Sequence, residues 1–158
     1  MFNTFLSNGG KMKGIKVWDR DRNNFEKVIY DILVLYGETG NGKSTIARNF
    51  AEESRGKGRG VEIEVTTELI EDMLEYMKKD IGLFDLNYFI QHRYEEVDVV
   101  ILEDFHEIKK KDLTQMYMAE FVVRLAKESK QVVIVCTGEI TDLEIFYKYL
   151  INHEYVIS

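Results

Sequence analysis

The segment GETGNGKS, Gly37 to Ser44, is the part of the chain whose residue types and spacing point most directly to chemistry. It fits the pattern GxxxxGK[ST], follows an apolar strand-like run and leads into a helical pattern, Thr45 to Glu53. Glycines at these positions let the backbone turn tightly, so that successive amide groups can point at phosphate oxygens. Lys43 can then reach the β and γ phosphates, and the Ser44 hydroxyl can ligate magnesium.

The segment therefore predicts a site for ATP or ADP with Mg²⁺. The alternative, a glycine-rich turn that merely joins a strand to a helix, would not need a lysine followed by a hydroxyl at that offset. The predicted binding residues are Gly37, Glu38, Thr39, Gly40, Asn41, Gly42, Lys43, Ser44 and Thr45.

Two adjacent acids stand where a second apolar run ends. In DVVILEDFHE, Asp98 to Glu107, these are Glu103 and Asp104. Ligand sites of open parallel sheets lie beyond the carboxyl ends of the strands, which is also where the phosphate loop would sit. One carboxylate there would orient magnesium, directly or through water, and its neighbour could polarise an attacking water. The alternative is a solvated pair of acids that ends a strand.

A third apolar run ends in Cys136 and Thr137, which a parallel sheet would bring to the same edge. Thr137 could hydrogen-bond the attacking water or a γ-phosphate oxygen. Cys136 is interpreted as a buried filler and not as a nucleophile, because no basic partner is evident near it in sequence. The three histidines lack metal-ligand spacing, and only His106, close after the two acids, has a position of interest.

The elements that must position these residues follow from the apolar pattern. Three runs are continuously apolar, as in interior strands covered on both faces: Ile32 to Tyr36, Val99 to Leu102 and Val132 to Cys136. Helical patterns alternate with them, which favours an α/β fold of three layers with a mainly parallel sheet. Val61 to Val65 alternates and predicts a half-solvated edge strand. With Tyr155 to Ile157 as a short last strand, five strands are expected, with the phosphate-loop strand central.

Length and composition predict a single soluble domain over residues 1–158. The chain has 45% apolar residues, and 28 Asp and Glu against 21 Lys and Arg give a net charge of -7. This balance disfavours a protein whose main work is non-specific binding to nucleic acid or to a membrane surface. No apolar run reaches the roughly 20 residues of a membrane span, and no signal peptide is evident, so a cytoplasmic location is expected.

Taken together and in this order, these motifs resemble the AAA+ ATPases of replication initiation, the DnaA initiators and their DnaC-type helicase-loader relatives. The resemblance implies an AAA+ P-loop fold that binds ATP, hydrolyses it slowly and switches a protein partner, such as a replication initiator or a helicase. It also implies that Phe5 lies near the adenine. Beyond the phosphate loop, the similar segments are Phe2 to Phe5, Val65 to Leu74, Arg93 to Ile108 and Lys130 to Glu139.

The chain departs from the family at several positions. Family members usually have Asp followed by Asp or Glu at the acidic strand end, and by position the resemblance implies Glu103 for magnesium and Asp104 for positioning water. Thr137 stands where the family has Asp or Asn. Leu150 to Tyr155 holds no arginine, although the family places one there that reaches a neighbour's nucleotide.

Because the sequence stops shortly after these residues, we expect no lid subdomain and no helix-turn-helix. We therefore expect weak or indirect contact with DNA, no membrane association, and a monomer or small oligomer. Two other functions remain open. A small-molecule or nucleotide kinase would need an arginine-rich lid, which is not evident. A regulator that binds nucleotide without turnover is favoured by the missing arginine.

Overall fold

The computed structural model describes residues 5–6, 12–19, 30–37, 42–79, 85–138 and 140–152. At its centre is a six-stranded sheet in the order β1-β2-β3-β6-β5-β4. All neighbouring strands are parallel except β1, which is antiparallel to β2. The strands are β1 (Phe5–Leu6), β2 (Met12–Asp19), β3 (Tyr30–Gly37), β4 (Val61–Val65), β5 (Val99–Glu103) and β6 (Gln131–Thr137).

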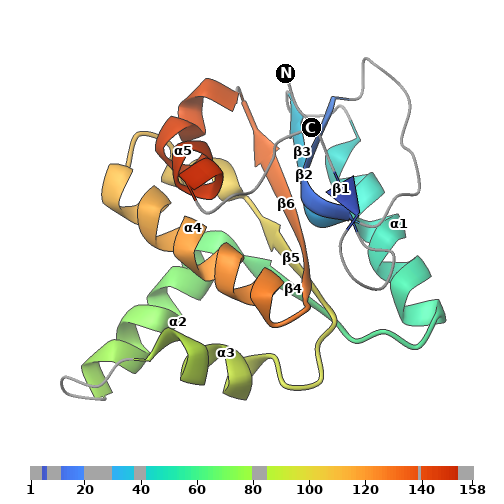
Figure 1. Cartoon of the computed structure of the whole chain (residues 1–158), viewed down its shortest axis with the longest axis horizontal. Coiled ribbons are helices and arrows are strands. Elements are labelled where there is room, and N and C mark those ends of the chain that lie inside the picture. The colour runs from blue at the N-terminus through green and yellow to red at the C-terminus, as the bar shows by residue number, and fades with distance from the viewer. Residues whose placement is uncertain are drawn as a thin grey trace.

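Helices cover both faces of this sheet (Figure 1). Of the helices in the described residues, α1 lies on one face, and α2 to α5 lie on the other. Short 3-10 helices, η3 and η4, follow the ends of β5 and β6. The helical elements are α1 (Lys43–Gly56), α2 (Thr66–Lys79), α3 (Leu86–Arg93), η3 (Phe105–Ile108), α4 (Asp112–Lys127), η4 (Ile140–Leu143) and α5 (Glu144–Asn152).

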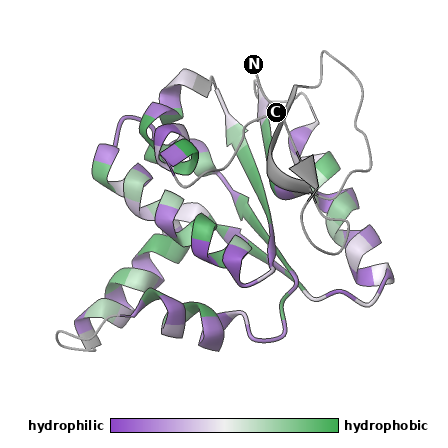
Figure 2. Ribbon diagram, in the orientation of Figure 1, coloured by the Kyte–Doolittle hydropathy of each residue, from purple (hydrophilic) through white to green (hydrophobic). Residues whose placement is uncertain are grey.

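Two apolar cores account for the continuously apolar strands. Along β3, Ile32 and Val34 pack into the core under α2 to α5, whereas Leu33 and Leu35 pack against Ala47 of α1. Strands β5 and β6 divide their side chains in the same way. Figure 2 shows these strands as a hydrophobic centre with hydrophilic residues on the outer helical surfaces. Because side chains alternate across a strand, burial on both faces requires every position to be apolar.

The structure confirms the predicted α/β class, the three layers and the mainly parallel sheet. Strand β3, which leads into the phosphate loop, is interior, and β4 is an edge strand as expected. The expected number of five strands was wrong, because β1 and β2 extend the sheet beside β3. The pattern of β2 mixes lysines with apolar residues and was not interpreted as a strand. Tyr155 to Ile157 lie outside the described residues.

The edge strand β4 is less solvated than its alternation suggests. Glu62 is exposed, but Glu64 is only 7% exposed. Its carboxylate accepts hydrogen bonds from Arg93 Nε at 2.7 Å and Nη2 at 3.1 Å, and from the Tyr94 hydroxyl at 2.5 Å. The hydrogen bond to Glu64 raises the pKa of Arg93, and burial raises the pKa of Tyr94. The buried carboxylate is therefore fully partnered, and it ties β4 to the end of α3.

This cluster predicts a large effect of removing the arginine. Arg93→Ala would leave Glu64 buried without its cation, and we expect a loss of about 3 kcal/mol in the free energy of unfolding. Lys148→Ala, which removes an exposed pair with Glu144 on α5, should cost only about 0.5 kcal/mol. Urea denaturation of both variants measures the difference. Equal losses would contradict the assigned role of the buried cluster.

Candidate nucleotide-binding site

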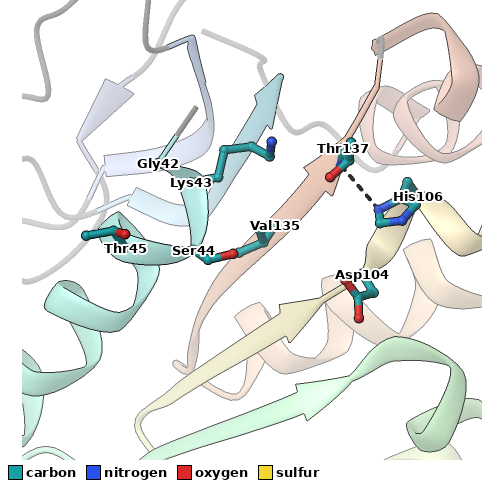
Figure 3. A pocket seen from close by; sticks show the side chains of 8 residues that line it. All are labelled: Gly42, Lys43, Ser44, Thr45, Asp104, His106, Val135 and Thr137. Atoms are coloured by element: carbon teal, nitrogen blue, oxygen red, sulfur yellow. Dashed lines mark hydrogen bonds between the residues drawn. The ribbon is translucent and has the colours of Figure 1, made fainter. Parts of the chain in front are cut away.

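A cavity of about 530 Å³ lies beyond the carboxyl ends of the central strands, next to the start of α1 (Figure 3). The parallel register explains this meeting, because Gly37 at the end of β3 is paired with Thr137 at the end of β6. The cavity is lined by Gly42, Lys43, Ser44, Thr45, Asp104, His106, Val135 and Thr137. Three segments far apart in sequence thus form one pocket.

Glycines stand at both ends of the phosphate loop. Gly37, at the end of β3, has φ 139°, and Gly42, just before α1, has φ 88°. Residues other than glycine rarely adopt these backbone angles. Gly42 also accepts the first helical hydrogen bond, from Ile46 at 3.0 Å. Residues 38–41, predicted to contact phosphate, lie outside the described residues, and their role stays a prediction.

Lys43 is the most deeply buried of the ionisable residues that line the cavity. It is only 4% exposed, and its Nζ donates a hydrogen bond of 2.8 Å to the Gly37 carbonyl. The same carbonyl accepts from the Gly138 amide at 3.0 Å. Burial lowers the pKa of Lys43, because the charged form loses hydration. An anion in the cavity would restore part of that lost stabilisation, so the site favours a negatively charged ligand.

The two acids do not face the cavity equally. Strand β5 ends at Glu103, and Asp104 takes a left-handed conformation, φ 56°, before η3 begins. Asp104 lines the cavity, whereas Glu103 is half-buried outside the lining set. The Glu103 carbonyl accepts a hydrogen bond of 2.7 Å from the Thr66 hydroxyl. The turn therefore places Asp104 at the cavity, whereas Glu103 remains the last residue of β5 and does not line it.

The end of β6 contributes Thr137, as predicted, and lies beside a residue that the sequence indicated less clearly. The Thr137 amide donates to Nδ1 of His106 at 3.3 Å, and the His106 ring lines the cavity (Figure 3). The only sequence signal for His106 was its position close after the acids. Cys136 is buried, and burial is the main cause that raises its pKa to about 12. This confirms its interpretation as a filler.

The donor set of the cavity fits a magnesium ion held partly by phosphate. The Ser44 hydroxyl and the Asp104 carboxylate offer oxygen, which is the donor that magnesium prefers. Among the described residues, no group of three His, Cys, Asp or Glu side chains could hold a metal. Magnesium in nucleotide sites commonly has one or two protein ligands and takes the rest from phosphates and water.

The remaining predicted residue, Phe5, is described only by its strand pairing, and its role stays a prediction. Phe5 belongs to β1 and is paired with Lys13 of β2. No arginine within the described ranges lines the cavity. Arg93 is held by Glu64 and Asp72, and Arg124 by Glu120. These two guanidinium groups are therefore engaged away from the site.

Comparisons with known proteins identify the family of the chain. A model of the family described as "Bacterial DnaA ATPAse domain" matches residues 1–154. The chain belongs to this family. Among curated proteins, the chain is similar to the chromosomal replication initiator protein DnaA of Aquifex aeolicus, with 24% identity over 106 residues. That match covers 67% of this chain and 25% of the relative, so the chain spans about a quarter of the relative's length.

Solved structures of DnaA share the fold. AMPPCP-bound DnaA from Aquifex aeolicus matches with a TM-score of 0.58 and 20% identity, covering 79% of this chain and 38% of that one. A replication initiator DnaA bound to AMPPCP and single-stranded DNA matches with a TM-score of 0.59 and 20% identity, covering 80% and 39%. These findings confirm the resemblance to DnaA and the AAA+ fold. In the part of the chain that the structure describes, no helix is long and apolar enough to cross a membrane.

Proposed function

We propose that this DnaA-type domain binds ATP and ADP with magnesium, hydrolyses ATP slowly and uses its nucleotide state to control a protein partner in DNA replication. The observation that carries the proposal is the buried Lys43 at the start of α1, in one cavity with Ser44, Asp104 and Thr137. The DnaA structures with AMPPCP support a triphosphate ligand for this fold.

The residues of the cavity have distinct proposed roles. The backbone from Gly37 to Thr45 surrounds the phosphates, and Lys43 leaves the Gly37 carbonyl to pair with their charge. Ser44 and Glu103 would hold magnesium, Glu103 through water, since Asp104 and not Glu103 lines the cavity. When bound, magnesium would neutralise charge on the phosphates. Asp104 orients the attacking water, and Thr137 hydrogen-bonds this water or a γ-phosphate oxygen. Phe5 contacts the adenine.

The proposal of slow hydrolysis rests on the described residues that line the cavity, none of which is an arginine. Charge on the transferred phosphoryl group can be stabilised by an arginine, which speeds hydrolysis by a factor of about a thousand or more. No described arginine lines the cavity, and Arg93 and Arg124 are held in ion pairs. We propose that fast turnover needs an arginine from another protein. A nucleotide-binding regulator without turnover is the limiting case of this proposal.

The proposed partner is a protein, and DNA contact is weak or indirect. A net charge of -7 opposes binding to a phosphate backbone. One matched DnaA is bound to single-stranded DNA, but this chain covers only 39% of that protein. We propose that the domain acts in the cytoplasm as a monomer or small oligomer.

The first test of nucleotide binding is Lys43→Ala. Loss of a charge-assisted contact in a desolvated site should weaken ATP binding by about 2 kcal/mol or more. Isothermal titration calorimetry with Mg²⁺ measures the affinity. Lys57→Ala, which changes an exposed lysine at the other end of α1, is the matched control and should bind ATP like the wild type. A folded Lys43→Ala variant with unchanged affinity would refute the site.

The acids can be separated by isosteric amides. Asp104→Asn should retain ATP affinity and lose most turnover, because the amide cannot orient water as a carboxylate does. Glu103→Gln should instead raise the Mg²⁺ concentration needed for half-maximal ATP binding. Calorimetry across a magnesium series and a phosphate-release assay provide the two readouts. The opposite pattern would exchange the two roles.

Turnover measured across a protein concentration series tests the missing arginine. We expect a low rate per molecule that stays constant with concentration, and a monomer or small oligomer by size-exclusion chromatography in ATP. A rate that rises steeply with concentration, together with a large ATP-dependent assembly, would show that the chain supplies its own activating arginine.

A further inference from the structure

His106 links two parts of the proposed site that come from different strands. It belongs to η3, two residues after Asp104, and its ring reaches the end of β6. The described contacts include no role for this ring in the apolar cores, although its neighbours Phe105 and Ile108 are buried there. Its side chain instead lies at the cavity with Asp104 and Thr137 (Figure 3). The inference below rests on the proposed ATPase function.

Both ring nitrogens of His106 face protein groups. Nδ1 accepts the hydrogen bond from the Thr137 amide at 3.3 Å, so in the neutral ring the proton is on Nε2. Nε2 lies 3.5 Å from Oε1 of Glu107, which is exposed. The orientation of the ring is therefore set by Thr137 on one side and by a solvated carboxylate on the other.

The turn that carries Asp104 needs such support. The left-handed backbone conformation of Asp104, φ 56°, is uncommon outside glycine, although Asp adopts it more readily than most residues, and contacts around the turn help to hold it. Within the turn, the Glu107 amide donates to the Asp104 carbonyl at 3.1 Å. Phe105 and Ile108 anchor the turn to the core, and the His106 contact is its polar connection to β6.

We propose that His106 is a positioning residue for ATP hydrolysis, which acts through Nδ1 by holding the Asp104 turn against Thr137. Asp104 and Thr137 are the two groups assigned to the attacking water, and their separation must be maintained for reaction. A displacement on the order of 1 Å can reduce a rate by a factor of about 100. His106 itself contributes no atom to the reaction.

Two substitutions distinguish the two ring nitrogens. His106→Asn places an amide oxygen near the position of Nδ1, where it can accept from the Thr137 amide. His106→Gln places its polar atoms near Nε2 instead. His106→Ala removes both. His92→Ala is the matched control, because the His92 ring lies tilted against Tyr88 of α3, with ring centroids 4.1 Å apart, and does not line the cavity.

The first measurement is hydrogen exchange of the Thr137 amide by NMR without nucleotide. We expect exchange at least tenfold faster in His106→Ala and His106→Gln, and near-wild-type exchange in His106→Asn and His92→Ala. The second measurement is steady-state ATP hydrolysis. We expect kcat to fall tenfold or more in His106→Ala and His106→Gln, KM to stay within twofold, and His106→Asn to restore most of kcat.

Each contrary result overturns the inference. Unchanged exchange of the Thr137 amide in His106→Ala would show that the hydrogen bond to Nδ1 does not protect this amide. Unchanged kcat in the same variant would show that the contact does not affect hydrolysis. Rescue by Gln but not by Asn would assign the role to Nε2. A wild-type chain that binds ATP without hydrolysing it would also overturn the positioning role. If the wild type bound neither ATP nor ADP, the proposed function itself would fail, and the Thr137 exchange would still decide whether the contact exists.

Discussion

The structure depends on burying both faces of a parallel sheet. Strands β3, β5 and β6 are apolar at nearly every position, so they are stable only with α1 on one face and the other helices opposite. Parallel strands joined by helical crossovers all end at the same edge of the sheet. The burial that stabilises the fold therefore also brings Lys43, Asp104 and Thr137 to one cavity.

The cavity is lined by a buried positive charge, that of Lys43. Lys43 is nearly fully buried, and its described hydrogen bond goes to the Gly37 carbonyl. Such an arrangement is costly in an empty site and favourable around an anion. The Gly37 carbonyl oxygen also accepts a hydrogen bond from the Gly138 amide, so Lys43 and the segment after β6 bind to the same acceptor. A phosphate that attracts Lys43 would thus change the surroundings of both segments.

Away from the cavity, a buried charged group is paired within the protein. Glu64 is buried with three donated hydrogen bonds from Arg93 and Tyr94, which leaves that carboxylate satisfied. This pairing stabilises the edge of the sheet and also engages an arginine. Glu64 is thus paired within the structural core, whereas the buried ammonium group of Lys43 lies at a cavity that an anion could enter.

The sequence by itself determined the class of fold and pointed to the end of β3 and the start of α1 as the proposed phosphate site. The apolar runs require two-sided burial, and GETGNGKS carries local backbone requirements that glycine satisfies, such as φ 88° at Gly42. These signals are local, so they can be interpreted without knowing what lies nearby. Strand β2 was missed because its mixed pattern becomes a strand only by pairing with β3.

Tertiary structure alone decided which side chains meet. Glu103 and Asp104 are equivalent by type, and the left-handed turn after β5 selects Asp104 for the cavity. The burial of Glu64 depended on Arg93, which lies 29 residues away in sequence. The contact between His106 and Thr137 spans 31 residues. Such pairs depend on register and turn geometry, which residue types and spacing do not encode on their own.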